Sequence, residues 1–509
     1  MRSVSTMQTE VVDRRKRFFR NSIFGVLSWL LPIVPTMIAT PIVIKRLGDE
    51  QYGVLAAVLS FIAYFFTTAI GKVAAKYVAE YRATGQNEKI SPMISATIIF
   101  GVSTTLVVSL IAFIFARPIV VDALRIPEQM QDQAVTGIYI ACATILSIFM
   151  AQVFQFALQG IHRFDWYLLL ANLTSVSFSL GSIAIVLLGY GWIALLAWNL
   201  VTWSIVGVVS FFAARHLIPE CRLTLKIPSE IWRSVRQYAL GIVGYQLFGT
   251  LLLFFERVWI LRNFGGEAMA YYVIPMTLAL YLHLFTASLV LAMFPVVNEL
   301  LDEPEKLKEL YQKATKLVLT LLVFAVLSVV VCGKVFLTAW LGERYADECY
   351  VMLVIQTVTF AILALNTIAW QVAEGFKAAA LNAYGTIFWM FAGVIAMIAM
   401  SQSWQINGVA AGRLAGVLIF IPLIFYIEKR FLGGIFMKFW GATVIRILIA
   451  AIPAVGAELF LAKTLQPSWF TFFGSVAAGG IAYVGALFLT GFIDDGGKKM
   501  ARDLFAKYR

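Results

Sequence analysis

Long apolar stretches alternate with short polar segments along almost the whole chain. An α-helix needs about 20 residues to cross a hydrocarbon core about 30 Å thick, and the stretches are about that long or longer. Strands of a membrane barrel would be half as long and would alternate in polarity. The pattern therefore predicts an all-α, polytopic membrane protein. Fourteen transmembrane helices are expected, at residues 21–44, 53–70, 93–116, 133–158, 167–188, 192–214, 238–261, 271–297, 317–339, 349–373, 381–400, 405–427, 439–462 and 469–492.

The polar segments between these spans contain echoes of one another. KRLGDE at 45–50 resembles RNFGGE at 262–267, which lies 217 positions later. ALQGIHR at 157–163 resembles VAEGFK at 372–377, at an offset of 215 positions. Because the echoes are ordered and fall in equivalent loops, they indicate two related sets of six helices in parallel orientation.

A third echo supports the same duplication and sets the expected domain limits. WIALLAW at 192–198 falls on NGVAAGR at 407–413, again 215 positions apart. We expect an N-lobe at 1–214, a cytoplasmic linker at 215–237, a C-lobe at 238–427, and an appended helix pair with a cytoplasmic tail at 428–509.

Composition and charge agree with a membrane protein and fix its expected orientation. Of the 509 residues 61% are hydrophobic and 13% charged, whereas soluble domains carry about a quarter charged residues. The net charge of +12 would suggest nucleic acid in a soluble protein. Here Lys and Arg concentrate in the segments on the side of the N-terminus, which places both termini in the cytoplasm by the positive-inside rule. No nucleic-acid partner is expected.

The stretch from Asn21 to the end of LGDEQYG (47–53) resembles the polysaccharide flippases of the O-antigen type. These belong to the larger group of multidrug, oligosaccharidyl-lipid and polysaccharide exporters. The resemblance in sequence covers about residues 1–430. For the last two helices only their number agrees with these flippases. It continues through QGIHRFDWYLLLAN (159–172), ERVWILRNFGGEAMAYYVIP (256–275), MFPVVNEL (293–300) and EGFKAAALNAYG (374–385).

The resemblance implies a fold of two six-helix lobes around a V-shaped cavity, with two extra helices. It implies a flippase that moves an undecaprenyl-diphosphate-linked oligosaccharide across the bacterial cytoplasmic (inner) membrane, for O-antigen or exopolysaccharide synthesis. The expected partners are this lipid-linked substrate and membrane lipids, and polysaccharide polymerase and co-polymerase proteins are candidates. No phosphate-binding glycine loop or metal-ligand cluster is visible in the sequence, so neither an enzyme activity nor a cofactor is expected.

Arg413 is the strongest candidate for binding a diphosphate. A charge within a span costs about 2.5–3.5 kcal/mol on insertion scales, so such residues are functional candidates by default. Arg413 lies roughly eight residues, or ~12 Å, into the twelfth span. The resembling flippases usually have a small residue at this position. The alternative is a structural pair with an acid on a neighbouring helix.

Three further charges lie within or near spans. Glu256 and Arg257 stand near the outer end of the seventh span, where the resemblance implies that Arg257 is a cavity cation and Glu256 its organiser. Snorkelling to the interface is the alternative. Arg446 in the thirteenth span can line the cavity, but a structural or lipid-facing role fits equally well.

Lys72 and Lys76 share a helix face at the cytoplasmic end of the second span, and Arg20 stands at the mouth of the first. They can receive the incoming diphosphate, although positive-inside anchoring explains them as well. His283, near the middle of the eighth span, can serve proton coupling or can be a neutral helix contact.

Three other functions remain open. A multidrug or cation antiporter of the same fold should show a buried acidic site, whereas the deep charges here are mainly arginines. An integral-membrane polysaccharide-assembly enzyme would need a substantial outer domain, and the expected outer loops are short. A scaffold within a polysaccharide assembly is the third alternative.

Overall fold

The computed structural model describes residues 31–64, 67–291 and 293–492, and these contain helices but no strands. This confirms the predicted all-α class. Residues 31–47 form the first described helix. It is followed by α2 (Asp49–Tyr64), α3 (Thr67–Ala83), η1 (Asn87–Lys89), α4 (Ile90–Ile114), α5 (Ala116–Pro118), η2 (Ile119–Ala123), α6 (Glu128–Gly160), α7 (Phe164–Leu187), α8 (Trp192–Leu217), α9 (Ser229–Leu291), α10 (Met293–Glu299), α11 (Pro304–Leu341), α12 (Glu343–Gly375), α13 (Ala379–Val417), α14 (Phe420–Phe431), α15 (Met437–Thr464) and α16 (Trp469–Leu489).

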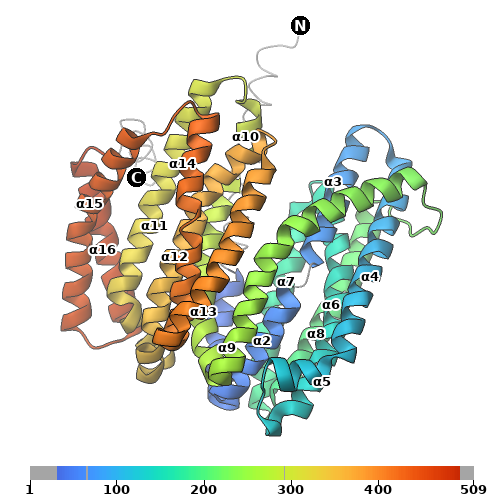
Figure 1. Cartoon of the computed structure of the whole chain (residues 1–509), viewed down its shortest axis with the longest axis horizontal. Coiled ribbons are helices and arrows are strands. Elements are labelled where there is room, and N and C mark those ends of the chain that lie inside the picture. The colour runs from blue at the N-terminus through green and yellow to red at the C-terminus, as the bar shows by residue number, and fades with distance from the viewer. Residues whose placement is uncertain (1–30, 65–66, 292, 493–509) are drawn as a thin grey trace, which may run out of the picture. The chain divides into compact units, whose positions relative to one another are not determined.

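The chain divides into two compact units, which we call the N-unit (residues 1–270) and the C-unit (residues 271–509). The division falls inside α9. In the N-unit, α6 is the central helix and packs against α2, α3, α4, α7 and α8 (Figure 1). The interior face of α6 is rich in Ala, Ile and Phe, so its neighbours approach closely and bury one continuous apolar core.

The C-unit is built in the same way around α12. This helix packs against α10, α11, α13 and α14, and α11 carries α15 and α16 on its other side (Figure 1). The contact between α11 and the last two helices is a separate apolar cluster, in which Phe324 stacks on Tyr483. The expected appended pair therefore attaches to the C-unit through α11.

Ten helical stretches within the described residues are long and apolar enough to cross a membrane, so the protein is a multi-pass membrane protein. Two helices contain a non-helical turn, at Gly265 in α9 and at Trp404–Gln405 in α13. Each of these two therefore consists of two helices, and those of α13 pack closely against each other. The count of fourteen spans and the cytoplasmic position of both termini remain predictions.

Backbone turns repeat along the chain with the spacing of the sequence echoes. Residues in the left-handed region recur 215 to 217 positions apart, and α6 and α12 each have 33 residues. A duplicated backbone explains both facts, although the expected lobe limits remain a prediction. The pairs are Gly48 and Gly265, Arg125 and Gly342, His162 and Lys377, and Gly189 and Gln405.

Several helices are longer than the apolar spans predicted for them. α3 continues to Ala83, although the second span was expected to end at residue 70. α9 begins at Ser229 rather than residue 238, and α11 begins at Pro304 rather than residue 317. Hydropathy detects only the part of a helix suited to lipid, whereas a charged segment can continue the same helix in water. These helices therefore extend beyond the expected spans, and the span boundaries themselves stay predictions.

Candidate functional site

The two polar corners that repeat in the sequence touch each other in the N-unit. A Cβ placed on Gly53 would lie 1.7 Å from the carbonyl oxygen of Gly266, and one on Gly266 would lie 2.6 Å from that of Glu50. Only glycine permits this approach of two backbones. The corners thus fix α2 against the turn of α9, close to the segment that carries Glu256 and Arg257. The echoes revealed equivalent turns but gave no signal that they would be in contact.

Glu256 and Arg257 are both buried in the N-unit. Glu256 is 0% exposed and Arg257 5% exposed, so neither lies at an open interface. Their side chains form a long ion pair, with 3.9 Å between Arg257 Nη1 and Glu256 Oε1. Adjacent residues on a helix point about 100° apart, which explains why the contact is long.

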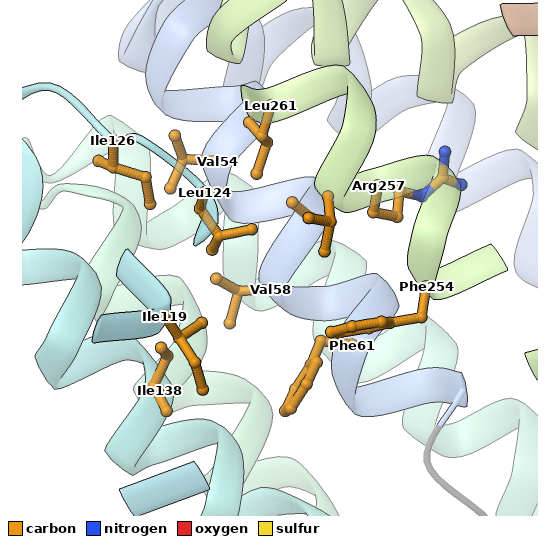
Figure 2. A pocket seen from close by; sticks show the side chains of 12 residues that line it. Val54, Val58, Phe61, Ile119, Leu124, Ile126, Ile138, Phe254, Arg257 and Leu261 are labelled. Carbon is orange, nitrogen blue, oxygen red and sulfur yellow. The ribbon is translucent and has the colours of Figure 1, made fainter. Parts of the chain in front are cut away.

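Arg257 also borders an apolar pocket of about 50 Å³ between α2, α6, α9 and the η2 region. Figure 2 shows its nitrogen atoms on the side away from the other labelled side chains, so its stem contributes to the lining and its charge does not. The pocket itself therefore suits hydrocarbon rather than phosphate. Its labelled lining includes Val54, Val58, Phe61, Leu124 and Phe254.

Arg413 lies in the second helix of α13, after the turn at Gln405, and is 1% exposed. Gly408, Gly412 and Gly416 recur once per turn of this helix and let it approach the first helix of α13. A Cβ on Gly412 would lie 2.3 Å from the backbone nitrogen of Met397. This close packing of small residues is typical of membrane helix pairs. Because Gly412 immediately precedes Arg413, this packing also fixes the backbone at Arg413.

The guanidinium of Arg413 is seated among soft and aromatic groups of the C-unit. Its Nη1 lies 3.3 Å from Met276 Sδ. Its central carbon lies 4.9 Å from the ring centroid of Phe360 and 6.0 Å from that of Trp389. Ring faces attract cations by about 0.5–2 kcal/mol, more when desolvated, so these contacts offset part of the cost of burial.

Further polar atoms lie in this region. The ring centroids of His283 and Phe360 are 6.0 Å apart, so His283 lies beside one of the rings that contact Arg413. Among the described residues, neither His283 Nδ1 nor Trp389 Nε1 has a hydrogen-bond partner. Buried polar atoms usually have one, so these atoms are candidates for contacts with bound water or a ligand. The sequence indicated His283 only as an isolated candidate and gave no signal for Met276 or Phe360.

The remaining predicted site residues are exposed or undescribed. Lys72 and Lys76 are exposed on α3, and Lys76 Nζ lies 4.1 Å from the ring centroid of Tyr238. Arg446 is exposed on α15. Arg20 lies outside the described residues. The N-unit thus contains Lys72, Lys76, Glu256 and Arg257, while the C-unit contains Arg413 and Arg446.

The C-unit also buries the carboxylate of Glu428 in α14. Its Oε1 accepts hydrogen bonds from Tyr311 Oη at 2.9 Å and Trp440 Nε1 at 2.8 Å. Its Oε2 accepts the backbone N–H of Phe436 at 3.3 Å. The carboxylate therefore joins α11, α14 and the beginning of α15, which is a structural arrangement.

A second buried carboxylate, Glu458 in α15, contacts α11 and α16. Ser328 Oγ donates to Glu458 Oε1 at 2.6 Å, and the Cys332 thiol lies 3.9 Å from Oε2. Gly479 leaves the space that the Glu458 side chain occupies. Across the part of the chain that the structure describes, no three His, Cys, Asp or Glu residues are grouped to hold a metal ion.

A comparison with known protein families identifies the family of this sequence. The profile of the family described as Polysaccharide biosynthesis protein matches residues 18–301, which is more than half of the chain. The chain belongs to this family. No curated protein sequence is significantly similar to it.

Solved structures similar to this family member are membrane transporters. A lipid II flippase MurJ in an inward closed conformation matches with a TM-score of 0.68 and 12% identity, covering 93% of this chain and 97% of MurJ. An inward-facing multidrug resistance MATE transporter of the MOP superfamily matches with a TM-score of 0.63 and 14% identity, covering 81% and 94%. A MOP superfamily transporter from Pyrococcus furiosus, described by the reverse polarity of its binding pocket, gives 0.60 and 16%, covering 81% and 95%. At these identities the matches establish a MurJ- and MATE-like fold.

Proposed function

We propose that this protein is a flippase that moves an undecaprenyl-diphosphate-linked oligosaccharide from the cytoplasmic to the outer leaflet of the bacterial cytoplasmic membrane. Membership of the polysaccharide biosynthesis family and a fold shared with a lipid II flippase support the class of substrate. The observation that carries the proposal is the buried guanidinium of Arg413 in a membrane-spanning helix. The product serves O-antigen or exopolysaccharide synthesis.

The chemistry of the C-unit site suits a phosphorylated sugar head group. A buried guanidinium offers several N–H donors in a fixed plane, which matches the oxygens of a diphosphate. Trp389 and Phe360 beside it present ring faces, and His283 presents a ring nitrogen. In this proposal Arg413 binds the diphosphate, and the polar groups around it accept the first sugar.

The other site residues take roles along the same route. Lys72, Lys76 and Arg20 receive the head group on the cytoplasmic side, and Arg257, organised by Glu256, provides a second buried cation. Arg446 contributes least, because it is exposed on α15.

The proposed topology has fourteen helices and cytoplasmic termini, with lobes at 1–214 and 238–427, a linker at 215–237 and an appended pair within 428–509. Alternating access between the lobes moves the head group while the prenyl tail stays in lipid. Polysaccharide polymerase and co-polymerase proteins are proposed partners.

Deletion of the gene tests the proposed function. We expect an undecaprenyl-diphosphate-linked glycan to accumulate facing the cytoplasm and to disappear when the wild-type gene is restored. Arg413→Ala should fail to restore transport, whereas Arg233→Ala, a matched loss of an exposed arginine outside the proposed route, should succeed. Absence of accumulation would contradict the function, and full rescue by Arg413→Ala would contradict the site.

A cation or drug antiporter is the second candidate, because the fold is shared with MATE transporters and three carboxylates are buried within the described part of the chain. Glu428 and Glu458 accept hydrogen bonds that join helices of the C-unit, and Glu256 pairs with Arg257. These contacts favour structural roles. Expression in a strain that lacks drug efflux separates the two functions: an antiporter would raise drug tolerance and lose that effect on Glu458→Gln, whereas we expect no change in tolerance.

A further inference from the structure

An open cleft of about 550 Å³ with a mixed polar and apolar lining lies in the N-unit where α2, α6 and α8 begin. Binding sites for small molecules are typically about 300–1,000 Å³, so the size suits one or a few sugar rings. The cleft is at the same end of the helices as the corner at 45–50, which is the outer end in the proposed topology. Its polar and aromatic lining residues are Gln51, Asp132, Gln133, Thr136 and Trp192.

One wall of the cleft is held rigidly. Trp192 is 1% exposed, and its indole N–H donates to Gln133 Oε1 at 2.9 Å. An indole nitrogen can only donate, so the carbonyl end of Gln133 must face Trp192. The amide NH2 of Gln133 is therefore the end left for a ligand. A side-chain amide fixed in this way is a donor for a hydroxyl or acetamido oxygen.

The charge of the cleft selects among possible ligands. Asp132 is the one charged residue among those lining the cleft, and its side chain is 92% exposed. Its Oδ1 lies 3.5 Å from Arg117 Nη1, a solvent-exposed contact that leaves the other oxygen accessible. A carboxylate accepts hydrogen bonds from sugar hydroxyls and repels phosphates and uronic acids. Gln51 adds a further polar side chain, whereas the Thr136 hydroxyl donates to the backbone carbonyl of Asp132 at 3.0 Å.

We propose that this cleft binds neutral or amino-sugar residues of the translocated head group on the outer side of the membrane. The proposal rests on the proposed flippase function and assigns the sugar-binding chemistry to residues separate from the arginines. A fixed amide donor and a carboxylate oxygen that stays accessible beside Arg117 supply hydrogen bonds of the kind that a polyol requires. The negative charge of Asp132 disfavours a diphosphate in this cleft.

Cysteine protection in the full-length protein tests the proposal. Thr136→Cys places a thiol in the cleft, and the four natural cysteines are all buried. Intact cells are treated with a membrane-impermeant maleimide in the presence of methyl glycosides of glucose, galactose, N-acetylglucosamine, galactosamine or glucuronic acid. At ten times its dissociation constant a bound glycoside leaves about one site in eleven free, so we expect roughly tenfold slower labelling.

The control and the outcomes are specific. Gln129→Cys lies exposed on the same helix outside the cleft and should label at a rate that no glycoside changes. Adding Gln51→Ala and Asp132→Asn to Thr136→Cys should remove the protection. Protection by a neutral or amino sugar supports the proposal. No protection by any glycoside, or protection by the glucuronide alone, overturns it.

The flippase function is judged separately. If the gene deletion accumulates lipid-linked glycan but Thr136→Cys shows no protection, the cleft proposal fails and the function stands. If Thr136→Cys does not label at all in intact cells but labels in broken cells, the cleft faces the cytoplasm and the outer-side proposal is wrong. Absence of glycan accumulation instead rejects the function itself.

Discussion

The last hairpin of each repeat shows the same backbone with different chemistry. In the N-unit, α7 and α8 turn at Gly189, and in the C-unit the two helices of α13 turn at Gln405, 216 positions later. Trp198 and Arg413 occupy matching positions at the offset of the sequence echo. Trp198 donates its indole N–H to the carbonyl of Ser177 at 3.0 Å and so completes ordinary helix packing.

Burying the charge of Arg413 in a membrane-spanning helix costs free energy, whereas burying the uncharged Trp198 does not carry this cost. The offset of 216 at the turn would instead match Arg413 with Ala197, and neither Trp198 nor Ala197 is charged, so the repeated fold does not require a cation here. The cost of a charge in a span must then be offset by a function or by a specific structural partner. The difference between the units agrees with the proposed role of Arg413 in substrate binding.

A second difference separates the ends of the same hairpins. At the offset of 215, Glu428 of α14 matches Ala213 of α8, and both are buried. Ala213 belongs to the apolar core of the N-unit, whereas Glu428 accepts hydrogen bonds that tie α11 and the beginning of α15 together. The carboxylate thus accompanies the appended helices, which the N-unit lacks among its described residues.

Gly412→Leu should have the largest effect on the C-unit hairpin. The new side chain would have to separate two helix backbones, since even a Cβ there would lie 2.3 Å from Met397 N. We expect little or no folded protein in size-exclusion chromatography of detergent extracts. Gly456→Leu, on an open face of α15, is the control and should be recovered normally. Normal recovery of Gly412→Leu would show that the glycine contact does not hold the hairpin.

The segment after α8 gives a prediction for the N-unit. Burial raises the pKa of the Cys221 thiol to about 11, partly opposed by Arg215. The reactive thiolate therefore forms only as pH rises toward that value, and at about pH 8 its fraction should be roughly a hundredfold below that of an ordinary thiol. Maleimide labelling in detergent should be correspondingly slow and should increase about tenfold per pH unit.

The matched control is Leu225→Cys in a Cys221→Ser background. Leu225 is 90% exposed four residues further along the same segment. Its thiol should label rapidly at the same pH. If Cys221 labels as fast as this control, the end of α8 is open rather than packed.

Glu428→Gln should have a smaller effect on stability. The amide keeps one acceptor oxygen but places an NH2 group against the backbone N–H of Phe436. Losing a hydrogen bond to a charged group costs about 1.5–3 kcal/mol, so we expect the thermal unfolding midpoint to fall. Glu305→Gln, 88% exposed, should leave the midpoint nearly unchanged. If the two substitutions lower the unfolding midpoint equally, Glu428 does not anchor the appended helices.

Hydropathy and the echoes predicted most of the architecture. Apolar stretches indicated membrane helices because a lipid core demands them, and the offset of the echoes matches the spacing of the left-handed turns. Helix ends were predicted poorly where charged residues continue a helix, as in α3 and α11. The contact of Gly53 with Gly266 depends on tertiary packing, which no local pattern encodes.

The candidate site was predicted in part. The sequence singled out Arg413 as deep, and the structure places it in the interior of the C-unit. The residues that surround it, Met276 and Phe360, come from other helices and are ordinary apolar residues, so periodicity gives them no distinction. The sequence also could not predict that Arg446 is exposed, because the face that α15 turns outward depends on which helices it packs against.

The most direct test compares Arg413→Gln with Trp198→Phe in proteoliposomes containing a fluorescent undecaprenyl-diphosphate-linked disaccharide. The measured quantity is the initial rate at which labelled head groups change leaflet, at equal amounts of folded protein. If Arg413 binds the diphosphate, Arg413→Gln should lower this rate by about tenfold or more, since one charge-assisted contact contributes about 1.5–3 kcal/mol. Trp198→Phe, which removes the matching side chain's hydrogen bond, should keep a rate near that of the wild type. Equal rates for all three proteins would contradict the account.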